Sequence, residues 1–293
     1  MGKLNGRVAV ITGAGRGLGR DHALLFATEG AMVVVNDVGG EASPAHDVVA
    51  EIRAAGGEAV AHTESVTEWD AAKRLVDMAV RTFGDLHVVV NNAGILRDRM
   101  LVNMTEDEWD SVISVHLKGH FCVTRHAAAY WREQSKANAT VDRSLIHTTS
   151  TSGLFANPGQ ANYGAAKSGI ASFSQIAAKE LGRFGVRSNS VAPVARTRLT
   201  LSIPGVGEKI AEVPEGFDKW DPANVSPLIA YLATEQCEFT GETFNVIGGQ
   251  ITRIQSWTSA EQLAKEERWS VDDLIEAGPS LVGKGIDKPV MAG

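Results

Sequence analysis

The sequence has few cysteines, no long apolar runs and a shortage of basic residues. Cys122 and Cys237 are the only cysteines among 293 residues, too few for a disulfide framework and consistent with a reducing compartment. The first apolar run, Val8–Ile11, is too short for a signal-peptide core, and no run approaches a membrane span. The 28 Lys and Arg against 35 Asp and Glu give a net charge of −7. We therefore expect a cytoplasmic protein that binds neither nucleic acid nor membranes.

Short apolar runs alternate with longer helical stretches, in a chain long enough for one large α/β domain with an elaboration. The runs that predict strands are Val8–Ile11, Met32–Asn36, His87–Val90, Ser144–His147, Val186–Val191 and Thr243–Val246. The stretches that predict helices are about Gly17–Glu29, Pro44–Ala55, Glu68–Phe83, Glu106–Arg132, Ala161–Arg183 and Pro222–Ala233. Apolar strands imply burial on both faces, so the pattern predicts an α/β fold with a doubly wound, Rossmann-like parallel sheet.

Two segments interrupt this alternation. Leu199–Trp220 is rich in Gly, Pro and charge and follows a predicted strand, so it is either a substrate lid or an ordinary long connection, and we favour the lid. The sheet pattern ends near residue 249, and we expect residues 1–249 to form a single dinucleotide-binding catalytic domain. Residues 250–293 would be a C-terminal extension, with short helices at Glu261–Arg268 and Val271–Ala277, packed on the domain or on a neighbouring subunit.

The first predicted strand runs into a glycine-rich turn, Thr12–Gly19, and a helix follows. Its spacing is Thr-Gly-x-x-x-Gly-x-Gly, because position 18 is leucine rather than glycine. Glycines at such a turn allow the backbone to approach a ligand closely, and the helix N-terminus offers free N–H groups to a pyrophosphate. Many glycine-rich turns bind nothing, but this one lies between a buried strand and a helix, which favours a dinucleotide site.

Asp37 ends the second predicted strand, close to the offset at which an acidic residue meets the adenosine ribose. Its carboxylate would accept hydrogen bonds from the ribose hydroxyls and would repel a 2′-phosphate. Arg16 argues in the other direction, because a guanidinium in the glycine loop could receive that phosphate. Asp37 lies where the ribose must lie, so we expect NAD rather than NADP as the cofactor. We expect no metal.

Only Tyr163 among the three tyrosines has a lysine, Lys167, four residues later. Side chains at i and i+4 share a helix face, so the Lys167 ammonium is expected near the Tyr163 hydroxyl. The preceding strand ends in Thr148–Gly153, which contains Ser150, at the carboxyl edge where α/β sheets bind ligands. The three side chains are therefore expected to meet in one site.

Proton transfer explains these residue types. Reducing a ketone requires a proton donor at the carbonyl oxygen, and oxidising an alcohol requires a base at the hydroxyl. Tyrosine ordinarily has a pKa of about 10, so we expect the positive charges of Lys167 and of an oxidised nicotinamide to lower the pKa of Tyr163. Ser150 would hold the substrate oxygen. Each residue alone has a structural alternative, a half-buried helix tyrosine or a cap, but together they predict a catalytic site.

The motifs in this order are typical of one family. They are Thr12–Gly19, Asn91-Asn92-Ala93-Gly94, Ser150, Tyr163-x-x-x-Lys167 and Asn189-Ser190-Val191-Ala192-Pro193. Through them the chain resembles the short-chain dehydrogenases/reductases over about Lys3–Gly249. The resemblance implies that Ser150 orients the substrate and that Tyr163 is the general acid/base. It implies that Lys167 binds the nicotinamide ribose and lowers the pKa of Tyr163.

The resemblance also implies which residues contact the cofactor. They are Gly13, Arg16, Gly17, Leu18, Gly19, Asp37, Ser65, Val66, Asn92, Ala93, Gly94, Tyr163, Lys167, Pro193 and Thr197. Three positions depart from the family pattern: His116 replaces a helix asparagine, Val194 replaces a glycine after Pro193, and Ser65 replaces an adenine-contacting aspartate. A neutral imidazole could hold the same relay water as the asparagine, so His116 is a further candidate catalytic residue.

A narrower likeness concerns the substrate. Val35–Gly40, Gly94–Arg99, His116 and Gly159–Tyr163 are similar to the (3R)-hydroxyacyl-CoA dehydrogenase part of peroxisomal multifunctional enzymes and to its bacterial stand-alone relatives. This likeness implies oxidation of a 3-hydroxyacyl-CoA to the 3-oxoacyl-CoA, a reaction of lipid metabolism. Cations that could hold the coenzyme A phosphates are Arg97, Arg99, Arg196, Arg198 and Lys209.

Two other functions remain open. The substrate could instead be a free secondary alcohol or a hydroxysteroid, or the chain could be a nucleotide-binding scaffold without turnover. The intact Ser150, Tyr163 and Lys167 argue against the scaffold. The family likeness and the helices Glu106–Arg132 and Ala161–Arg183, which have apolar residues for a partner as well as for the sheet, predict a homotetramer or a homodimer.

Overall fold

The computed structural model describes residues 2–137, 141–201, 207–211, 213–281 and 283. In this part of the chain the strands form one sheet, in the order β3-β2-β1-β4-β5-β6-β7-β8. They are β1 (Val8–Thr12), β2 (Met32–Asn36), β3 (Glu58–His62), β4 (Val88–Asn91), β5 (Arg143–Thr148), β6 (Val186–Val194), β7 (Thr243–Ile247) and β8 (Gln250–Ile254). Neighbouring strands are parallel except for the antiparallel pair β7 and β8. The fold is therefore α/β with a mostly parallel, Rossmann-like sheet, as predicted.

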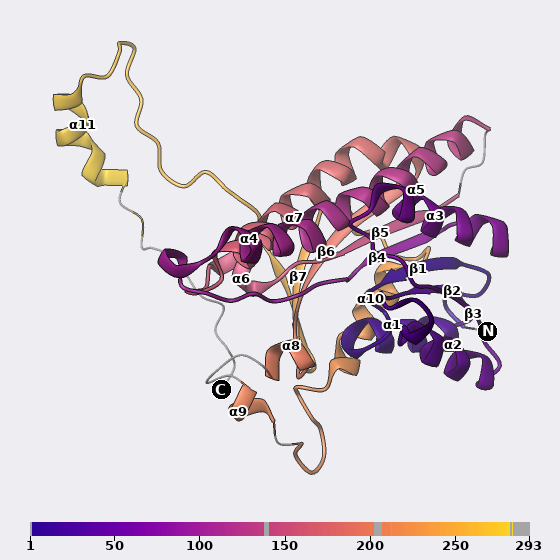
Figure 1. Cartoon of the computed structure of the whole chain (residues 1–293). Coiled ribbons are helices and arrows are strands. Elements are labelled where there is room, and N and C mark those ends of the chain that lie inside the picture. Colours follow the sequence, from indigo (N-terminus) through magenta and orange to yellow (C-terminus); the bar gives the residue numbers. More distant parts are fainter. Residues whose placement is uncertain (1, 138–140, 202–206, 212, 282, 284–293) are drawn as a thin grey trace. The chain divides into compact units, whose positions relative to one another are not determined.

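Helices cover both faces of the sheet (Figure 1). The helices are α1 (Gly17–Thr28), α2 (Ala45–Ala54), α3 (Trp69–Phe83), α4 (Glu106–Ile113), α5 (Gly119–Lys136), α6 (Thr151–Phe155), α7 (Ala161–Leu181), α8 (Arg198–Leu201), α9 (Gly207–Ile210), α10 (Ser226–Leu232) and α11 (Val271–Ala277). One apolar core joins the sheet to α1, α2 and α10, and a second joins it to α3, α5 and the end of α7.

The side chains of β1 show why the chain adopts these layers. All five residues of β1 are buried, and successive side chains point to opposite faces of a strand. Val8 and Val10 belong to one core, and Ala9 and Ile11 belong to the other. The neighbours of β1 are β2 and β4. The chain therefore continues from β1 to β2 and β3 on one side, and then crosses to β4 on the other side of β1. Ligands bind at the carboxyl ends of the strands beside such a switch point.

Several elements differ from the prediction. The edge strand β3 was not predicted, because its sequence Glu-Ala-Val-Ala-His has only one β-branched residue. The predicted helix Glu106–Arg132 is interrupted by a π-helical turn, Ser114–Lys118, which separates α4 from α5. The predicted helix Pro222–Ala233 begins instead as a 3₁₀ turn. The predicted helix Glu261–Arg268 is wrong, since those residues form no helix, whereas α11 is the predicted Val271–Ala277.

The sheet continues beyond Gly249, where we expected the catalytic domain to end, because β8 pairs with β7. The chain divides into a unit ending at Ile254 and a second unit of residues 255–293, in which the described regular structure is α11 and a short 3₁₀ turn. Within the described ranges, no helix has the length and apolar character needed to cross a membrane.

Candidate functional site

The glycine loop after β1 is built for close backbone approach. Gly13 and Gly17 have φ values of 62° and 52°, in the left-handed region that favours glycine. A Cβ atom on Gly19 would lie 2.3 Å from the Gly13 carbonyl oxygen. Helix α1 begins after Arg16 without a side-chain cap and without an acidic residue in its first turn. Its first N–H groups are therefore available to an anion.

The end of β4 holds this loop in place. The Thr12 hydroxyl oxygen accepts hydrogen bonds from the backbone N–H groups of Asn92, at 2.9 Å, and Ala93, at 3.1 Å. The Asn92 side-chain amide donates to the carbonyl oxygens of Thr12, at 3.0 Å, and Gly13, at 3.2 Å. The predicted cofactor residues of the two strands, which are about 80 positions apart in the sequence, thus lie together.

Asp37 follows β2 and lies against the glycine loop. Its carboxylate accepts hydrogen bonds from the N–H groups of Gly15 and Val38, each at 2.9 Å. Arg16, the competing residue for a 2′-phosphate, is exposed. Ser65 and Val66 follow β3 on the same edge, where the Ser65 hydroxyl contacts the Thr67 hydroxyl at 2.9 Å and Val66 is buried. These four predicted cofactor residues therefore line the β1–β2–β3 half of the edge.

Pro193 and Thr197 close the other half of the site. Pro193 lies in β6, opposite Val246 of β7. Thr197 follows β6, and its side-chain methyl would be 3.9 Å from a Cβ placed on Gly17. The backbone N–H of Thr197 donates to the Thr200 hydroxyl at 2.7 Å. Thr197 is therefore held beside the first turn of α1, next to the loop expected to bind the pyrophosphate.

The predicted catalytic side chains converge at the start of α7. Lys167 is 2% exposed, and its Nζ atom donates to the carbonyl oxygen of Thr148, the last residue of β5, at 2.6 Å. The Lys167 Nζ atom also lies 5.6 Å from the centre of the Tyr163 ring. The side chain of Ser150 acts on the proton affinity of Tyr163, and its hydroxyl caps α6 by accepting from the Ser152 N–H at 3.2 Å. The sheet edge and one helix face thus bring the three side chains together.

Burial changes the proton affinities of this pair in opposite directions. It raises the pKa of Tyr163 to about 12, although the Ser150 side chain opposes the rise. It lowers the pKa of Lys167 to about 7. The expectation that Lys167 and an oxidised nicotinamide together lower the pKa of Tyr163 stays a prediction, because in the protein alone removal from water is the dominant effect. The phenol needs further positive charge to act as a base near neutral pH.

His116 lies in the π-helical turn beside Tyr163. The two rings are edge to face, with centroids 5.1 Å apart. The His116 Nε2 atom lies 2.7 Å from the Ile95 carbonyl oxygen, while Nδ1 has no hydrogen-bond partner among the described residues. Burial, reinforced by the charge of Lys167, lowers the pKa of His116 to about 3. The imidazole is therefore neutral and has one buried nitrogen free. A Cβ on Gly94 would lie 2.4 Å from this ring.

Sequence reasoning missed polar residues near Tyr163. The Gln160 amide donates to Asp98 at 2.7 Å, and its oxygen accepts from the Ser152 hydroxyl at 2.7 Å. Asp98 adds to the rise in the pKa of Tyr163 through its negative charge. These residues come together because the segments before α4 and before α7 meet in a bridge between Arg99 and Gln160. A bridge between distant loops has no sequence pattern.

The predicted loop Leu199–Trp220 is described only in part. It contains α8 and α9, where Leu201 is exposed and Ile210 is buried. Ile203, Gly205 and Val206 of the predicted lid lie outside the described residues. A Cβ on Gly207 would be 2.2 Å from the Leu201 carbonyl oxygen, so the ends of α8 and α9 are in close contact.

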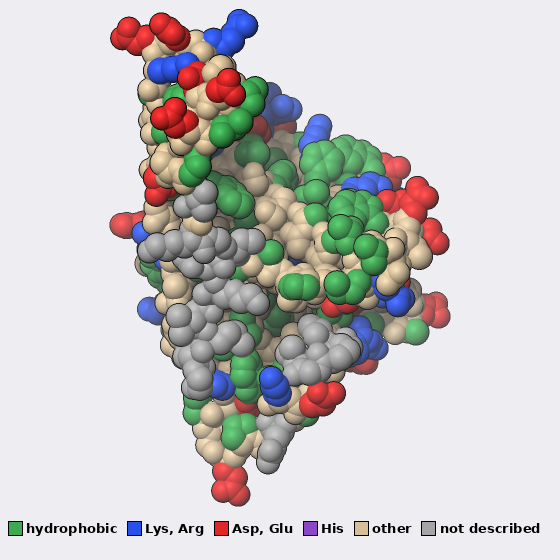
Figure 2. Space-filling model, turned by 90° about the vertical axis from the view of Figure 1, so that its left-hand side faces the viewer, with side chains coloured by type: hydrophobic (Ala, Val, Ile, Leu, Met, Phe, Trp, Pro, Cys, Tyr) green, Lys and Arg blue, Asp and Glu red, His purple; other side chains and the backbone are tan. Residues whose placement is uncertain are grey.

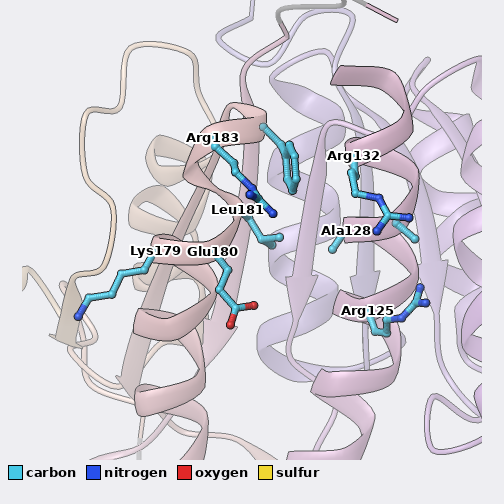
Figure 3. A pocket seen from close by; sticks show the side chains of 9 residues that line it. Arg125, Ala128, Arg132, Lys179, Glu180, Leu181 and Arg183 are labelled. Atoms are coloured by element: carbon cyan, nitrogen blue, oxygen red, sulfur yellow. The ribbon is translucent and has the colours of Figure 1, made fainter. Parts of the chain in front are cut away.

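A cavity of about 560 Å³ lies elsewhere, between the C-terminal halves of α5 and α7 (Figure 3). Its charged lining residues are Arg125, Arg132, Lys179, Glu180 and Arg183. Lys179 is about four helical turns along α7 from Tyr163, or roughly 24 Å at 1.5 Å per residue. None of the predicted site residues lines this cavity, so it is separate from the catalytic side chains.

The residues at the sheet edge fit a nicotinamide dinucleotide. The uncapped start of α1 and its glycine cradle suit a pyrophosphate, and Asp37 suits a ribose. The fold and these residues define a dinucleotide-dependent dehydrogenase. The chain belongs to the short-chain dehydrogenase family, whose pattern matches residues 7–201. It is therefore an oxidoreductase of the kind that uses NAD(P).

Individual relatives are similar over most of the chain. A hydroxyacyl-CoA dehydrogenase, ChsB1, of Mycobacterium tuberculosis is 47% identical over 259 residues, which cover 86% of this chain and 80% of that protein. The mouse peroxisomal multifunctional enzyme type 2 is 41% identical over 86% of this chain, which spans 33% of that longer protein. The crystal structure of a short chain dehydrogenase from Mycobacterium avium covers 98% of both chains, with 47% identity and a TM-score of 0.88.

The cradle gives a first prediction. Gly19→Ala places a methyl group against the Gly13 carbonyl and the Asn92 amide, so the loop must shift. We expect the affinity for NADH or NADPH, measured by fluorescence titration, to fall by roughly tenfold or more, about 1.4 kcal/mol. Gly182→Ala is the matched control, because nothing lies within 4 Å of its added Cβ. Equal affinity of Gly19→Ala and the unaltered protein would contradict the assignment of the loop.

Proposed function

We propose that the chain is an NAD-dependent dehydrogenase that oxidises the 3-hydroxyl group of an acyl-CoA to the ketone. The observation that carries the proposal is the convergence of Ser150, Tyr163 and Lys167 at one end of the glycine-loop edge. The nicotinamide, when bound, accepts or returns the hydride. Asp37 supports NAD over NADP, since a carboxylate hydrogen-bonded beside the glycine loop opposes a second phosphate there.

The chain's own residues handle the proton. Tyr163, deprotonated, removes the hydroxyl proton of the substrate, and in the reverse direction it donates that proton to the carbonyl oxygen. Ser150 holds the same oxygen through a hydrogen bond without changing its charge. Lys167 supplies the positive charge that favours the phenolate and would bind the ribose hydroxyls. His116, neutral and with Nδ1 free, holds a relay water behind Lys167 in place of the family's asparagine.

The acyl-CoA substrate is supported by relatives and by surface charge. ChsB1 is called a hydroxyacyl-CoA dehydrogenase, and the peroxisomal relatives include hydratase-dehydrogenase-epimerases. Of the five candidate cations, Arg99 pairs with Glu108 and Arg196 with Asp218. The three others have no carboxylate partner in the described ranges; they are Arg97, Arg198 and Lys209. They are the candidates for the coenzyme A phosphates.

The surface also has exposed apolar residues that would contact an acyl chain. Met100, Leu101 and Val102 follow one another between β4 and α4 and are all exposed. Figure 2, a view from the side on which α4 and α6 appear in Figure 1, shows hydrophobic side chains at the surface. Covering such residues with a chain contributes about 25 cal/mol per Å² removed from water. The loop 199–220 is the proposed cover.

A free secondary alcohol or hydroxysteroid is the second candidate substrate, because the same apolar surface would suit a ring system. We also propose that the chain works in the cytoplasm as a homotetramer or homodimer. The proposed interface is the outer face of α5 and α7, where Phe121 is 46% exposed and Ile176 is 49% exposed. Large apolar side chains at this exposure are suited to burial against a second copy.

Tyr163→Phe removes only the hydroxyl group at the reaction centre. We expect turnover to fall by at least about a thousandfold, with the dinucleotide affinity nearly unchanged. Lys167→Ala should reduce both, because Lys167 touches the ribose and charges the site. The measurements are the initial rate of NADH formation and a separate NADH titration. Substantial residual turnover in Tyr163→Phe would refute the proton-transfer role.

Asp37→Ala tests the cofactor preference. The unaltered protein should bind NADH at least about tenfold more tightly than NADPH, an advantage of about 1.4 kcal/mol. The variant should lose most of this difference, because the carboxylate that accepts ribose hydrogen bonds and repels the 2′-phosphate is gone. Paired titrations measure both constants. If NADPH bound the unaltered protein as well as NADH, the assignment of NAD would be wrong.

The substrate class is tested by comparing a 3-hydroxyacyl-CoA with its pantetheine fragment. The full thioester should have a KM lower by about tenfold or more, because the phosphates meet Arg97 and Arg198. Arg97→Gln and Arg198→Gln should narrow that gap, while Arg81→Gln, an exposed arginine of α3, should leave it unchanged. Turnover of a free steroid or alcohol without turnover of acyl-CoA would instead support the second candidate.

A further inference from the structure

A pair of buried histidines lies behind the catalytic lysine. His120 belongs to the first turn of α5 and is 1% exposed, and His147 belongs to β5 and is fully buried. Their Nδ1 atoms are 3.2 Å apart, and their rings stack with centroids 5.3 Å apart. His147 immediately precedes Thr148, whose carbonyl oxygen holds the Lys167 ammonium. The pair is therefore joined to the backbone group that positions Lys167.

The contacts of the pair favour one arrangement of its protons. The side-chain amide nitrogen of Asn91 donates to the Thr124 hydroxyl at 3.1 Å and lies 3.4 Å from the His147 Nδ1 atom. An amide nitrogen only donates, so His147 Nδ1 is an acceptor and its proton is on Nε2. In this arrangement His120 Nδ1 donates to the same nitrogen at 3.2 Å, and the Nε2–H of His147 has no partner among the described residues. The Nε2 atom of His120 is then a lone pair, and it has no partner among the described residues.

Lys167, in turn, has hydrogen-bond donors that lack acceptors within the described ranges. Its ammonium has three N–H donors, and one of them meets the Thr148 carbonyl. No carboxylate is paired with Lys167 in the described part of the chain. The charge of Lys167 acts on His116, His120 and His147, which places all three imidazoles near it. Unsatisfied donors and an unsatisfied acceptor thus share one buried region, where each unmade hydrogen bond costs about 1–3 kcal/mol.

We propose that His120 is a positioning residue for the catalytic lysine: its Nε2 atom accepts a hydrogen bond from the Lys167 ammonium, directly or through one buried water, while His147 fixes its orientation. This inference rests on the proposed function of Tyr163 and Lys167. A buried water is suited to such a place because it would meet the His120 Nε2 lone pair, which has no partner among the described residues, and the two remaining donors of the ammonium. A neutral imidazole stabilises the cation without cancelling its charge, whereas a carboxylate would cancel it.

The effect on catalysis follows from the charges around Lys167. The titratable groups that face it are Tyr163 from α7, His116 from the π-helical turn, His120 from α5 and His147 from β5. Burial and the positive charge of Lys167 lower the pKa of His120 well below its ordinary value, so it stays neutral and remains an acceptor. A hydrogen bond to an ammonium favours its charged form. The charged form in turn favours the phenolate of Tyr163.

Two substitutions at one position separate this role from simple packing. His120→Asn keeps an amide near the Nδ1 position, which can still donate to His147, but it has no group at the Nε2 position. His120→Gln keeps an acceptor near the Nε2 position. His22→Asn is the matched control, because His22 is also a buried histidine, bonded through Nδ1 to the Ser226 hydroxyl at 2.8 Å, and the charge of Lys167 does not act on it.

The measurement is the pH profile of kcat/KM for substrate oxidation, with thermal melting to confirm folding. The activity rises with pH as Tyr163 loses its proton. In His120→Asn the ammonium keeps the Thr148 carbonyl but loses the proposed second acceptor, so its charged form is less favoured. The rising limb should therefore move up by about one pH unit, which is roughly tenfold in kcat/KM below the limb. His120→Gln and His22→Asn should keep the limb of the unaltered protein. Equal shifts in both His120 variants, or no shift in His120→Asn, would overturn the proposal.

A second readout does not depend on activity. Long-range ¹H–¹⁵N spectra of histidine-labelled protein distinguish the two neutral tautomers, and His120→Gln identifies the His120 signals. We expect His120 to carry its proton on Nδ1, with an Nε2 shift that changes in Lys167→Ala. A proton on Nε2, or an imidazole that becomes charged near pH 6, would contradict the inference. If the unaltered protein oxidised no substrate, the proposed function would fail while this test of His120 would still stand.

Discussion

Lys167 is almost completely buried, and its ammonium donates to the carbonyl oxygen at the end of β5 at 2.6 Å. A cation removed from water loses hydration, and for that reason its pKa falls to about 7. The site therefore works only if the surrounding dipoles replace the lost water. This requirement links the sheet edge to the chemistry, because the Thr148 carbonyl is the acceptor seen in the structure, and it accounts for polar side chains in an apolar core.

The same polar interior also supports the cofactor side. Asn91 and Asn92 are consecutive at the end of β4, but they serve opposite directions. The amide of Asn91 lies against His147 and the Thr124 hydroxyl, while the amide of Asn92 donates to the carbonyls of the glycine loop. One strand end thereby links α5 and β5 to the dinucleotide cradle. Buried polar groups that satisfy one another in this way rigidify a site, since breaking one bond leaves another group unpaired.

Much of the fold could be read from the chain because the signals were local. Buried runs such as Met32–Asn36 have the composition of strands covered on both faces, and the spacing of Tyr163 and Lys167 puts them on one helix face. β3 was missed because small residues at a sheet edge give little periodicity. The π-helical turn that carries His116 was missed because one inserted residue changes the spacing of the apolar residues too little to be recognised in the sequence.

The sequence by itself determined the class of sheet, the glycine cradle, and the residue types for hydride and proton transfer, because each depends on neighbours within a few positions. Only the tertiary structure decided the electrostatics. Burial raises the pKa of Tyr163 in the protein alone, and it leaves His116 neutral with one nitrogen unpartnered among the described residues. The meeting of His120 with His147 was equally invisible in the chain, since 27 positions separate them. Desolvation and long-range contact depend on what surrounds a group in space, which no local pattern specifies.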